Sequence, residues 1–217
     1  IFFMDKVKVA NASDAYARLR VIGPEAGAAL ASLGFTLSDT VDGTAQVVGD
    51  LTAIAQQQYD LPGYELIVPA AGVDDVVARL DVPVAGAEAC HVRRIELGRP
   101  AAGAEITGEY SPLEAGLAWT CAENKGCYTG QEIIARQITY DKVTRLLVGL
   151  RSDAPLPTGN TVSAGDREIG QVTSSAYSPA MQAHIALAIL KRTHTEPGTA
   201  VRVGDTTATV AALPFDA

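Results

Sequence analysis

The second half of the chain carries a regular series of short apolar segments separated by glycine and proline. Turn residues between the segments include Gly159, Gly165 and the pair Pro197-Gly198. Evenly spaced short strands with turn signals between them are typical of a small barrel or sandwich. We therefore expect a small all-β barrel at the C-terminus. Its strands should lie near residues 146–150, 161–163, 168–174, 184–190, 200–203 and 207–211.

The first half mixes strand and helix patterns. A helix should begin at Gly23-Pro24 and end at Gly34, because proline suits the first turn of a helix and glycine suits its C-terminal cap. Val73, Val76, Val77 and Leu80 recur at helical spacing. Alternating or apolar segments predict antiparallel strands at 7–9, 16–21, 45–48, 51–55 and 64–68, and a third helix is expected over 88–97.

These patterns predict an α+β fold with two domains. Residues 1–143 should form a region of antiparallel sheet and helices, and residues 144–217 the C-terminal β-barrel. The sequence opens on Ile1 and apolar side chains follow at once. We therefore expect the first domain to be incomplete, with the chain beginning inside a longer polypeptide.

Composition excludes several classes of protein. The chain has 217 residues and a formal net charge of -8, which opposes a general nucleic-acid role because phosphate binding needs a basic face. No segment approaches the roughly 20 apolar residues of a membrane helix, so we expect no membrane partner. Cys90, Cys121 and Cys127 form neither a zinc pattern nor a disulfide framework, which favours a reducing, cytoplasmic compartment.

The segment from Lys125 to Glu132 is the strongest candidate for chemistry. Gly126 and Gly130 bracket Cys127, and Thr129 with Glu132 fits a capping box that predicts a helix through Arg136. A helix N-terminus and a nearby lysine favour a thiolate, which could attack an electrophile, exchange with a disulfide or bind a soft metal. A buried, inert cysteine is the plainer alternative. We call this octapeptide, Lys125-Gly126-Cys127-Tyr128-Thr129-Gly130-Gln131-Glu132, the cysteine loop.

Several segments in a fixed order resemble one superfamily. They are Arg94–Pro100, Gly103–Ile106, Ser111–Leu117, the cysteine loop, Gly165–Ser174 and the closing Leu213-Pro214-Phe215. Their order is similar to that of the superfamily containing the glycine-cleavage T-protein, an aminomethyltransferase, and the YgfZ-type folate-binding proteins. The resemblance is strong from about residue 87 onward. Cys127 separates the two branches and favours the YgfZ type.

The resemblance implies a function. A YgfZ-type protein binds tetrahydrofolate within a ring of subdomains and supports assembly or repair of iron–sulfur enzymes, so folate and iron–sulfur client or assembly proteins are the expected partners. Such a protein is not a conventional enzyme. The alternatives are a folate-dependent aminomethyltransferase of the glycine cleavage system and a fragment without a ligand site. Two departures from the family are expected. An N-terminal part of the family's folate site should be missing from this chain, and Cys90-His91 stands where some YgfZ-type proteins are expected to have an aromatic residue.

Candidate folate-binding residues follow from the resemblance and from the chemistry of folate. A flat pterin needs an acceptor and apolar or aromatic walls, and the acidic tail needs cations. Each residue also has a plain structural alternative in the core, in a cap or on the surface. Cys127 is the expected functional thiol, and no metal ligand is expected. The binding candidates are Glu105, Tyr110, Glu114, Trp119, Lys125, Gly126, Tyr128, Gly130, Gln131, Glu132, Arg136, Lys142 and Arg145.

Overall fold

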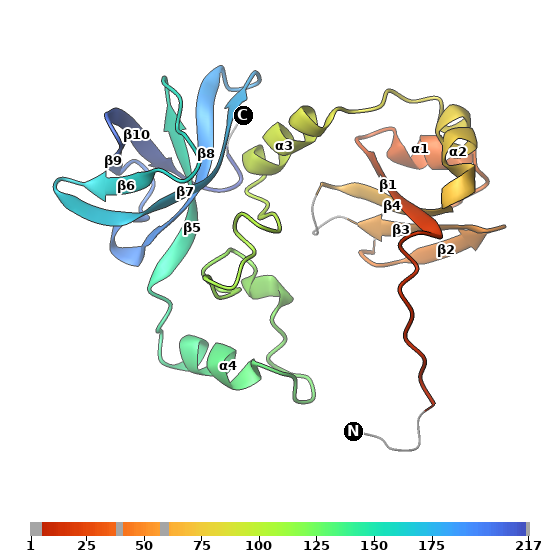
Figure 1. Ribbon diagram of the computed structural model, residues 1–217, viewed down its shortest axis with the longest axis horizontal. Helices are drawn as coiled ribbons and strands as arrows, with labels where there is room; N and C mark the ends of the chain where they lie inside the picture. Colours follow the sequence, from red (N-terminus) through yellow and green to blue (C-terminus); the bar gives the residue numbers. More distant parts are fainter. Residues whose placement is uncertain (1–5, 38–40, 57–60, 216–217) are drawn as a thin grey trace. The chain divides into compact units, whose positions relative to one another are not determined.

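The computed structural model describes residues 6–37, 41–56 and 61–215. The chain divides into two compact units, Ile1–Val84 and Ala85–Ala217 (Figure 1). Among the described residues, no helix is both long and apolar enough to span a membrane.

The first unit is an antiparallel sheet covered by helices. Its four strands have the order β1-β4-β3-β2, and both helices, α1 and α2, lie over the same face (Figure 1). The unit therefore has the predicted α+β layers. In chain order its elements are β1 (Tyr16–Ile22), α1 (Ala26–Ala31), β2 (Ala45–Val48), β3 (Leu51–Gln56), β4 (Gly63–Pro69), the 3-10 helix η1 (Ala70–Gly72) and α2 (Val73–Leu80).

The core of the first unit follows from the alternation of its strands. In β3, Leu51, Ala53 and Ala55 are buried, while the residues between them are partly exposed. Side chains two apart in a strand point to one face, so these three meet the helices. Val76 and Leu80, four apart on α2, close the core from the other side.

One predicted strand of the first unit is wrong. Val7 and Val9 alternate with Lys8, yet they lie outside any strand, and their side chains are 75% and 93% exposed. The first strand, β1, starts at Tyr16 and pairs along its whole length with β4. Alternation alone makes no strand unless a neighbouring strand accepts its backbone hydrogen bonds.

The second unit contains the predicted barrel. Six antiparallel strands close in the order β10-β5-β8-β7-β6-β9, and closure leaves no open sheet edge. Alternate side chains such as Ala186, Ala188 and Leu190 of β8 point inward and fill the interior. The strands are β5 (Arg145–Ser152), β6 (Thr161–Ala164), β7 (Arg167–Ser178), β8 (Ala183–Lys191), β9 (Ala200–Val203) and β10 (Thr206–Ala211), with the 3-10 helix η3 (Arg192–His194) after β8.

Helix α3 (Ala87–Glu96) packs against the outside of the barrel (Figure 1). Its buried Ile95 meets Ile185 and Leu187, which are the outward-facing residues of β8, together with Phe215 near the end of the chain. This contact groups residues 85–143 in space with the barrel. The predicted boundary between two domains at residues 143 and 144 stays a prediction.

A long connection leads from α3 to the barrel. It contains the 3-10 helix η2 (Ala118–Thr120) and the helix α4 (Gln131–Thr139). The predicted capping box at Thr129 is wrong. Gly130 occupies the N-cap with a φ of +87°, and its cap position makes no side-chain hydrogen bond. Glycine adopts this left-handed backbone without steric strain, so the turn geometry displaces Thr129 from the cap.

Candidate functional site

Three of the predicted folate residues meet beside the first strand of the barrel. Arg145, at the start of β5, donates from Nε to Oε1 of Glu114 at 2.9 Å and from Nη2 to Oε2 at 3.2 Å. Its guanidinium carbon lies 5.1 Å from the centroid of the Tyr110 ring. We call Tyr110, Glu114 and Arg145 the tyrosine–arginine cluster. It places an aromatic ring, a cation and a carboxylate in one position.

The electrostatics of this cluster fix its charges at neutral pH. Burial alone would raise the pKa of Glu114, but hydrogen bonds from Arg145 and from the Ser111 backbone outweigh burial and lower it. Burial, followed by the Glu109 carboxylate, raises the pKa of Tyr110. The hydrogen bonds to Glu114 raise the pKa of Arg145. The cluster therefore presents a carboxylate, a guanidinium and a neutral phenol.

Glu114 also has the structural role that its sequence position allows. Its carboxylate accepts from the Ser111 backbone N–H at 3.1 Å, and its own N–H donates to the Ser111 hydroxyl at 3.3 Å. This reciprocal pair has the form of a capping box. One carboxylate thus holds both the local turn and the guanidinium of Arg145.

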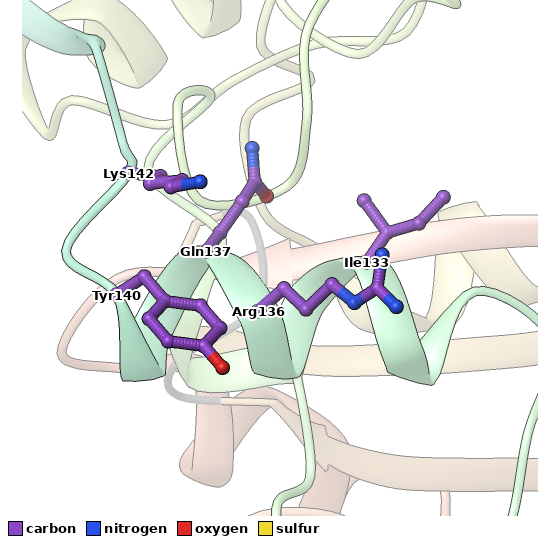
Figure 2. A pocket seen from close by; sticks show the side chains of 5 residues that line it. All are labelled: Ile133, Arg136, Gln137, Tyr140 and Lys142. Atoms are coloured by element: carbon purple, nitrogen blue, oxygen red, sulfur yellow. The ribbon is translucent and has the colours of Figure 1, made fainter.

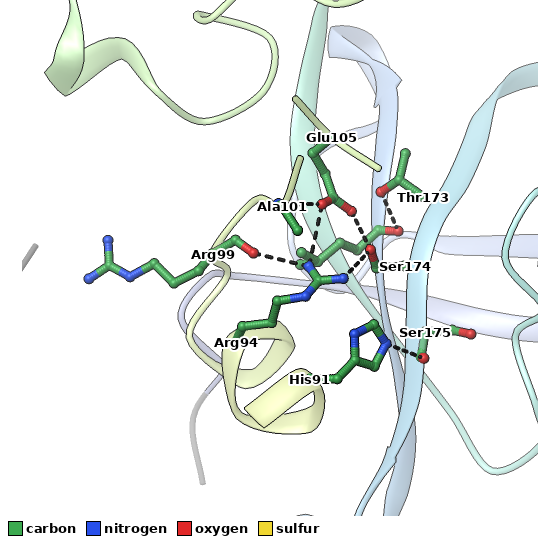
Figure 3. A network of polar contacts seen from close by, with 9 residues as sticks. His91, Arg94, Arg99, Ala101, Glu105, Thr173, Ser174 and Ser175 are labelled. Carbon is green, nitrogen blue, oxygen red and sulfur yellow. Dashed lines mark hydrogen bonds and ion pairs between the residues drawn. The ribbon is translucent and has the colours of Figure 1, made fainter. Parts of the chain in front are cut away.

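Glu105 lies in a different, fully enclosed network (Figure 3). Its side chain is 0% exposed, and its Oε1 accepts from the Ser174 hydroxyl of β7 at 2.6 Å. Its Oε2 accepts from the Ala101 backbone N–H at 2.9 Å and from Arg94 at 3.4 Å. Arg94 also donates to Ser174 at 2.7 Å, so the three side chains form a closed triangle.

The Glu105 network ties the loop after α3 to the barrel. Its carboxylate accepts from Ser174, Ala101 and Arg94, and no face of the side chain reaches solvent. A buried charge needs such partners, because burial without them costs several kcal/mol. The structure therefore gives Glu105 a scaffolding position, and the predicted contact with a pterin stays untested.

A third buried carboxylate, Glu96, joins the end of α3 to β7. It accepts from the Ser178 hydroxyl at 2.7 Å and from Arg93 at 2.8 Å. Burial alone would raise the pKa of Glu96, but the hydrogen bonds from Ser178 and Arg93 outweigh burial and lower it. Glu96, Glu105 and Glu114 thus share one design, in which an arginine pairs with the buried carboxylate and a serine residue donates a further hydrogen bond to it.

This design makes the second unit sensitive to acid. A carboxyl whose folded pKa lies below its ordinary value stabilises the fold above that value and loses the contribution as pH falls through the folded pKa. For Glu96 and Glu114 the ordinary value is 4.5. We expect the free energy of unfolding, measured by urea titration, to fall as pH is lowered below 4.5. Glu96→Gln should reduce this pH dependence, and an unchanged slope would contradict the assignment.

The cysteine loop precedes α4 and presents an exposed thiol. Cys127 lies four residues before Gln131, the first residue of the helix, and is an exposed, free cysteine. The Oε1 of Gln131 accepts from the Tyr128 N–H at 3.3 Å, and Lys125 Nζ lies 5.0 Å from the Tyr128 ring centroid. The alternative of a buried Cys127 is therefore wrong, and the reactivity of the thiol stays a prediction.

Two further predicted residues, Arg136 and Lys142, lie in a pocket on α4 (Figure 2). The pocket has a volume of about 420 Å³ and is lined by Ile133, Arg136, Gln137, Tyr140 and Lys142. Arg136 donates to Glu132 at 2.6 Å, which places predicted residue Glu132 in an exposed pair on the same helix. None of the residues that line this pocket belongs to the tyrosine–arginine cluster.

The structure also corrects one alternative for a candidate residue and adds residues that the sequence analysis did not nominate. Trp119 is 50% exposed on η2, so the alternative that it is a core residue is wrong, and its role as a wall of the folate site stays a prediction. Ile133, Gln137 and Tyr140 were not among the candidates, although their spacing along α4 could have indicated a shared face. Partners such as Ser174 and Ser178 carry no local sequence signal.

The chain matches two family descriptions over most of its length. Residues 3–125 match the GCVT N-terminal domain, and residues 145–216 match the glycine cleavage T-protein C-terminal barrel domain. The chain belongs to the glycine cleavage T-protein family. The predicted superfamily is thereby confirmed, together with the α+β region and the C-terminal barrel.

Individual relatives agree with this family. A putative chloroplastic transferase of Arabidopsis thaliana is 30% identical over 99% of this chain and 52% of its own length. The aminomethyltransferase of Saccharopolyspora erythraea is 36% identical, over 94% of this chain and 61% of its own. The glycine cleavage system aminomethyltransferase T from Bartonella henselae shares the fold, with a TM-score of 0.78, 23% identity and coverage of 89% and 58%. The chain thus spans about half to three-fifths of these relatives.

Proposed function

We propose that this chain binds tetrahydrofolate at the tyrosine–arginine cluster. The observation that carries the proposal is that Arg145 of β5 meets Tyr110 and Glu114 of the preceding connection, which sets a cation beside a flat aromatic wall while the carboxylate holds the cation in place. A flat wall and a cation are groups that a pterin with an acidic tail needs. When bound, tetrahydrofolate supplies a carrier for one-carbon units.

The residues present fit this ligand in part. The Tyr110 ring would lie against a flat ring of the ligand, and Arg145, whose side chain is 40% exposed, would hold a tail carboxylate. Glu114, whose buried carboxylate already accepts from Arg145 and Ser111, would hold the guanidinium in position. Glu105 does not fit, because its carboxylate is enclosed by protein donors. The assignment of Arg136 and Lys142 to the tail, and of the cysteine-loop residues to folate, stays a prediction.

Two specific roles are compatible with a folate-binding chain of this family. The first is an accessory factor that supports assembly or repair of iron–sulfur enzymes in the cytoplasm, with iron–sulfur proteins as partners. Its support is the cysteine loop, which exposes the Cys127 thiol. The second is an aminomethyltransferase of the glycine cleavage system, and its support is the activity named for the Saccharopolyspora erythraea relative.

Replacing Cys127 distinguishes these two functions. Because the side chain is exposed, Cys127→Ala should leave the fold intact, whereas Cys90→Ala removes a thiol outside the loop and serves as the matched control. If the accessory role holds, Cys127→Ala lowers the activity of iron–sulfur enzymes in cells, and Cys90→Ala leaves it normal. Normal activity with both variants would contradict the role of the thiol. Turnover of a carrier-bound aminomethyl group by the purified chain would favour the transferase.

A further inference from the structure

The carboxylate of the tyrosine–arginine cluster belongs to one short turn, residues 111–117. This turn ends at Gly116, whose φ of +74° lies in the left-handed region. The Leu117 N–H donates back to the Pro112 carbonyl at 2.8 Å. Such a bond beyond a left-handed glycine is a common way to end a helical turn, because glycine adopts this backbone without steric strain. Gly116 thus fixes the shape of the turn that carries Glu114.

The same turn contacts the barrel strand β5 at two points. Arg145 and Leu147 are two residues apart in β5, so their side chains point to the same face of the strand. Arg145 donates to Glu114 at 2.9 Å. Leu147 lies against Gly116, since a β-carbon added to Gly116 would be 3.1 Å from Cδ2 of Leu147, closer than carbon atoms normally pack. The turn is therefore held by an ion pair at one point and by a close apolar contact at the other.

Leu147 has little room to move away from Gly116. It packs against a buried apolar cluster on the outside of the barrel that includes Ile95 and Ile185. Protein interiors are close-packed, so a shift of one side chain displaces its neighbours. An added methyl group at Gly116 would therefore push the turn away from β5.

We propose that Gly116 is a positioning residue of the folate site, because the absence of a side chain there lets the turn approach Arg145. The inference rests on the proposed binding of tetrahydrofolate at the tyrosine–arginine cluster. Gly116 acts through Glu114 and Tyr110 rather than on the ligand. Tyr110 directly precedes the turn, so a shift of the turn moves its ring relative to the guanidinium. A binding group must be held to within about 0.5 Å of its productive position, which is the task of such supporting contacts.

The Arg145 side chain reports the position of the turn without any ligand. Its Nε–H donates to Glu114, so the Nε–H signal in a proton–nitrogen NMR spectrum depends on that hydrogen bond. The signal is identified by its loss in Arg145→Met. Gly116→Ala should shift it and Gly103→Ala should not. Gly103 is the matched control, because it has a φ of +80° in the same long connection and open space where a β-carbon would lie.

Removing the Leu147 side chain should reverse the effect of Gly116→Ala. Leu147→Ala eliminates Cδ2 and leaves the β-carbon of residue 147 at 3.7 Å, an ordinary contact. Gly116→Ala should raise the Kd for tetrahydrofolate about threefold to tenfold, and the double variant should recover most of the affinity. A general loss of stability would not be reversed in this way, since Leu147→Ala also removes core packing.

Three results would overturn the inference. An Arg145 signal that Gly116→Ala leaves unchanged means that the turn does not shift. An unchanged Kd despite a shifted signal means that its position does not matter for binding. A double variant no better than Gly116→Ala assigns the effect to backbone strain. None of these results contradicts folate binding, which fails instead if the unaltered chain shows no saturable binding of tetrahydrofolate, and the role of Gly116 in binding then fails with it.

Discussion

Glu105→Ala is expected to lower the free energy of unfolding of the second unit by about 3–5 kcal/mol, the cost of breaking a buried ion pair from one side. The substitution leaves Arg94, whose side chain is only 12% exposed, without its carboxylate. It also removes the acceptor of the Ser174 hydroxyl and of the Ala101 N–H. The loop after α3 would lose its polar attachment to β7. Urea unfolding followed by circular dichroism measures the loss.

Two further variants test whether the stability depends on the negative charge of Glu105 or on the size of its side chain. Glu105→Gln retains acceptor and size, so it should lose less stability than the alanine variant. Glu123→Ala removes an exposed carboxylate from the same long connection and should change stability by less than about 0.5 kcal/mol. If Glu105→Ala and Glu123→Ala are equally stable, the Glu105 network does not hold the loop on the barrel.

Arg145→Met is expected to weaken tetrahydrofolate binding by about 10-fold to 100-fold. The variant keeps much of the side-chain length but removes the cation, and a hydrogen bond to a charged group contributes about 1.5–3 kcal/mol. Titration calorimetry with tetrahydrofolate measures the change in Kd. Arg202→Met is the matched control, because Arg202 is an exposed arginine of β9 paired with Asp205.

Loss of Arg145 also leaves the buried carboxylate of Glu114 unpaired, so a fold defect must be distinguished from a binding defect. The double variant Glu114→Gln with Arg145→Met carries no unpaired charge in the cluster. If both variants fold and both retain the affinity of the unaltered chain, the tyrosine–arginine cluster does not bind folate.

Much of the fold could be predicted because its signals are local. Val73 to Leu80 is a helix in the structure with the bounds that its spacing indicated, and six strands close into the barrel where six apolar segments were found. Burial forces such periodicity on a sequence, since one face must be apolar. Helix α3 was predicted within one residue at each end.

The site was harder to predict because its contacts join distant segments. Ser174 and Glu105 are 69 positions apart, and Arg145 and Glu114 are 31 apart, so neither pairing has a sequence signature. Local patterns also misled where tertiary partners decide the outcome, as at Val7, which has no strand beside it in the described part of the chain. At the start of α4, the left-handed Gly130 displaced the expected Thr129 cap.

Titration calorimetry of tetrahydrofolate into the unaltered chain tests the central claim most directly. The comparison ligand is a tetrahydropterin without the glutamate tail, which keeps the flat ring and lacks the group assigned to Arg145. The account predicts saturable binding of tetrahydrofolate and weaker binding of the tail-less pterin. No saturable heat with tetrahydrofolate, or equal affinity for the two ligands, would contradict it.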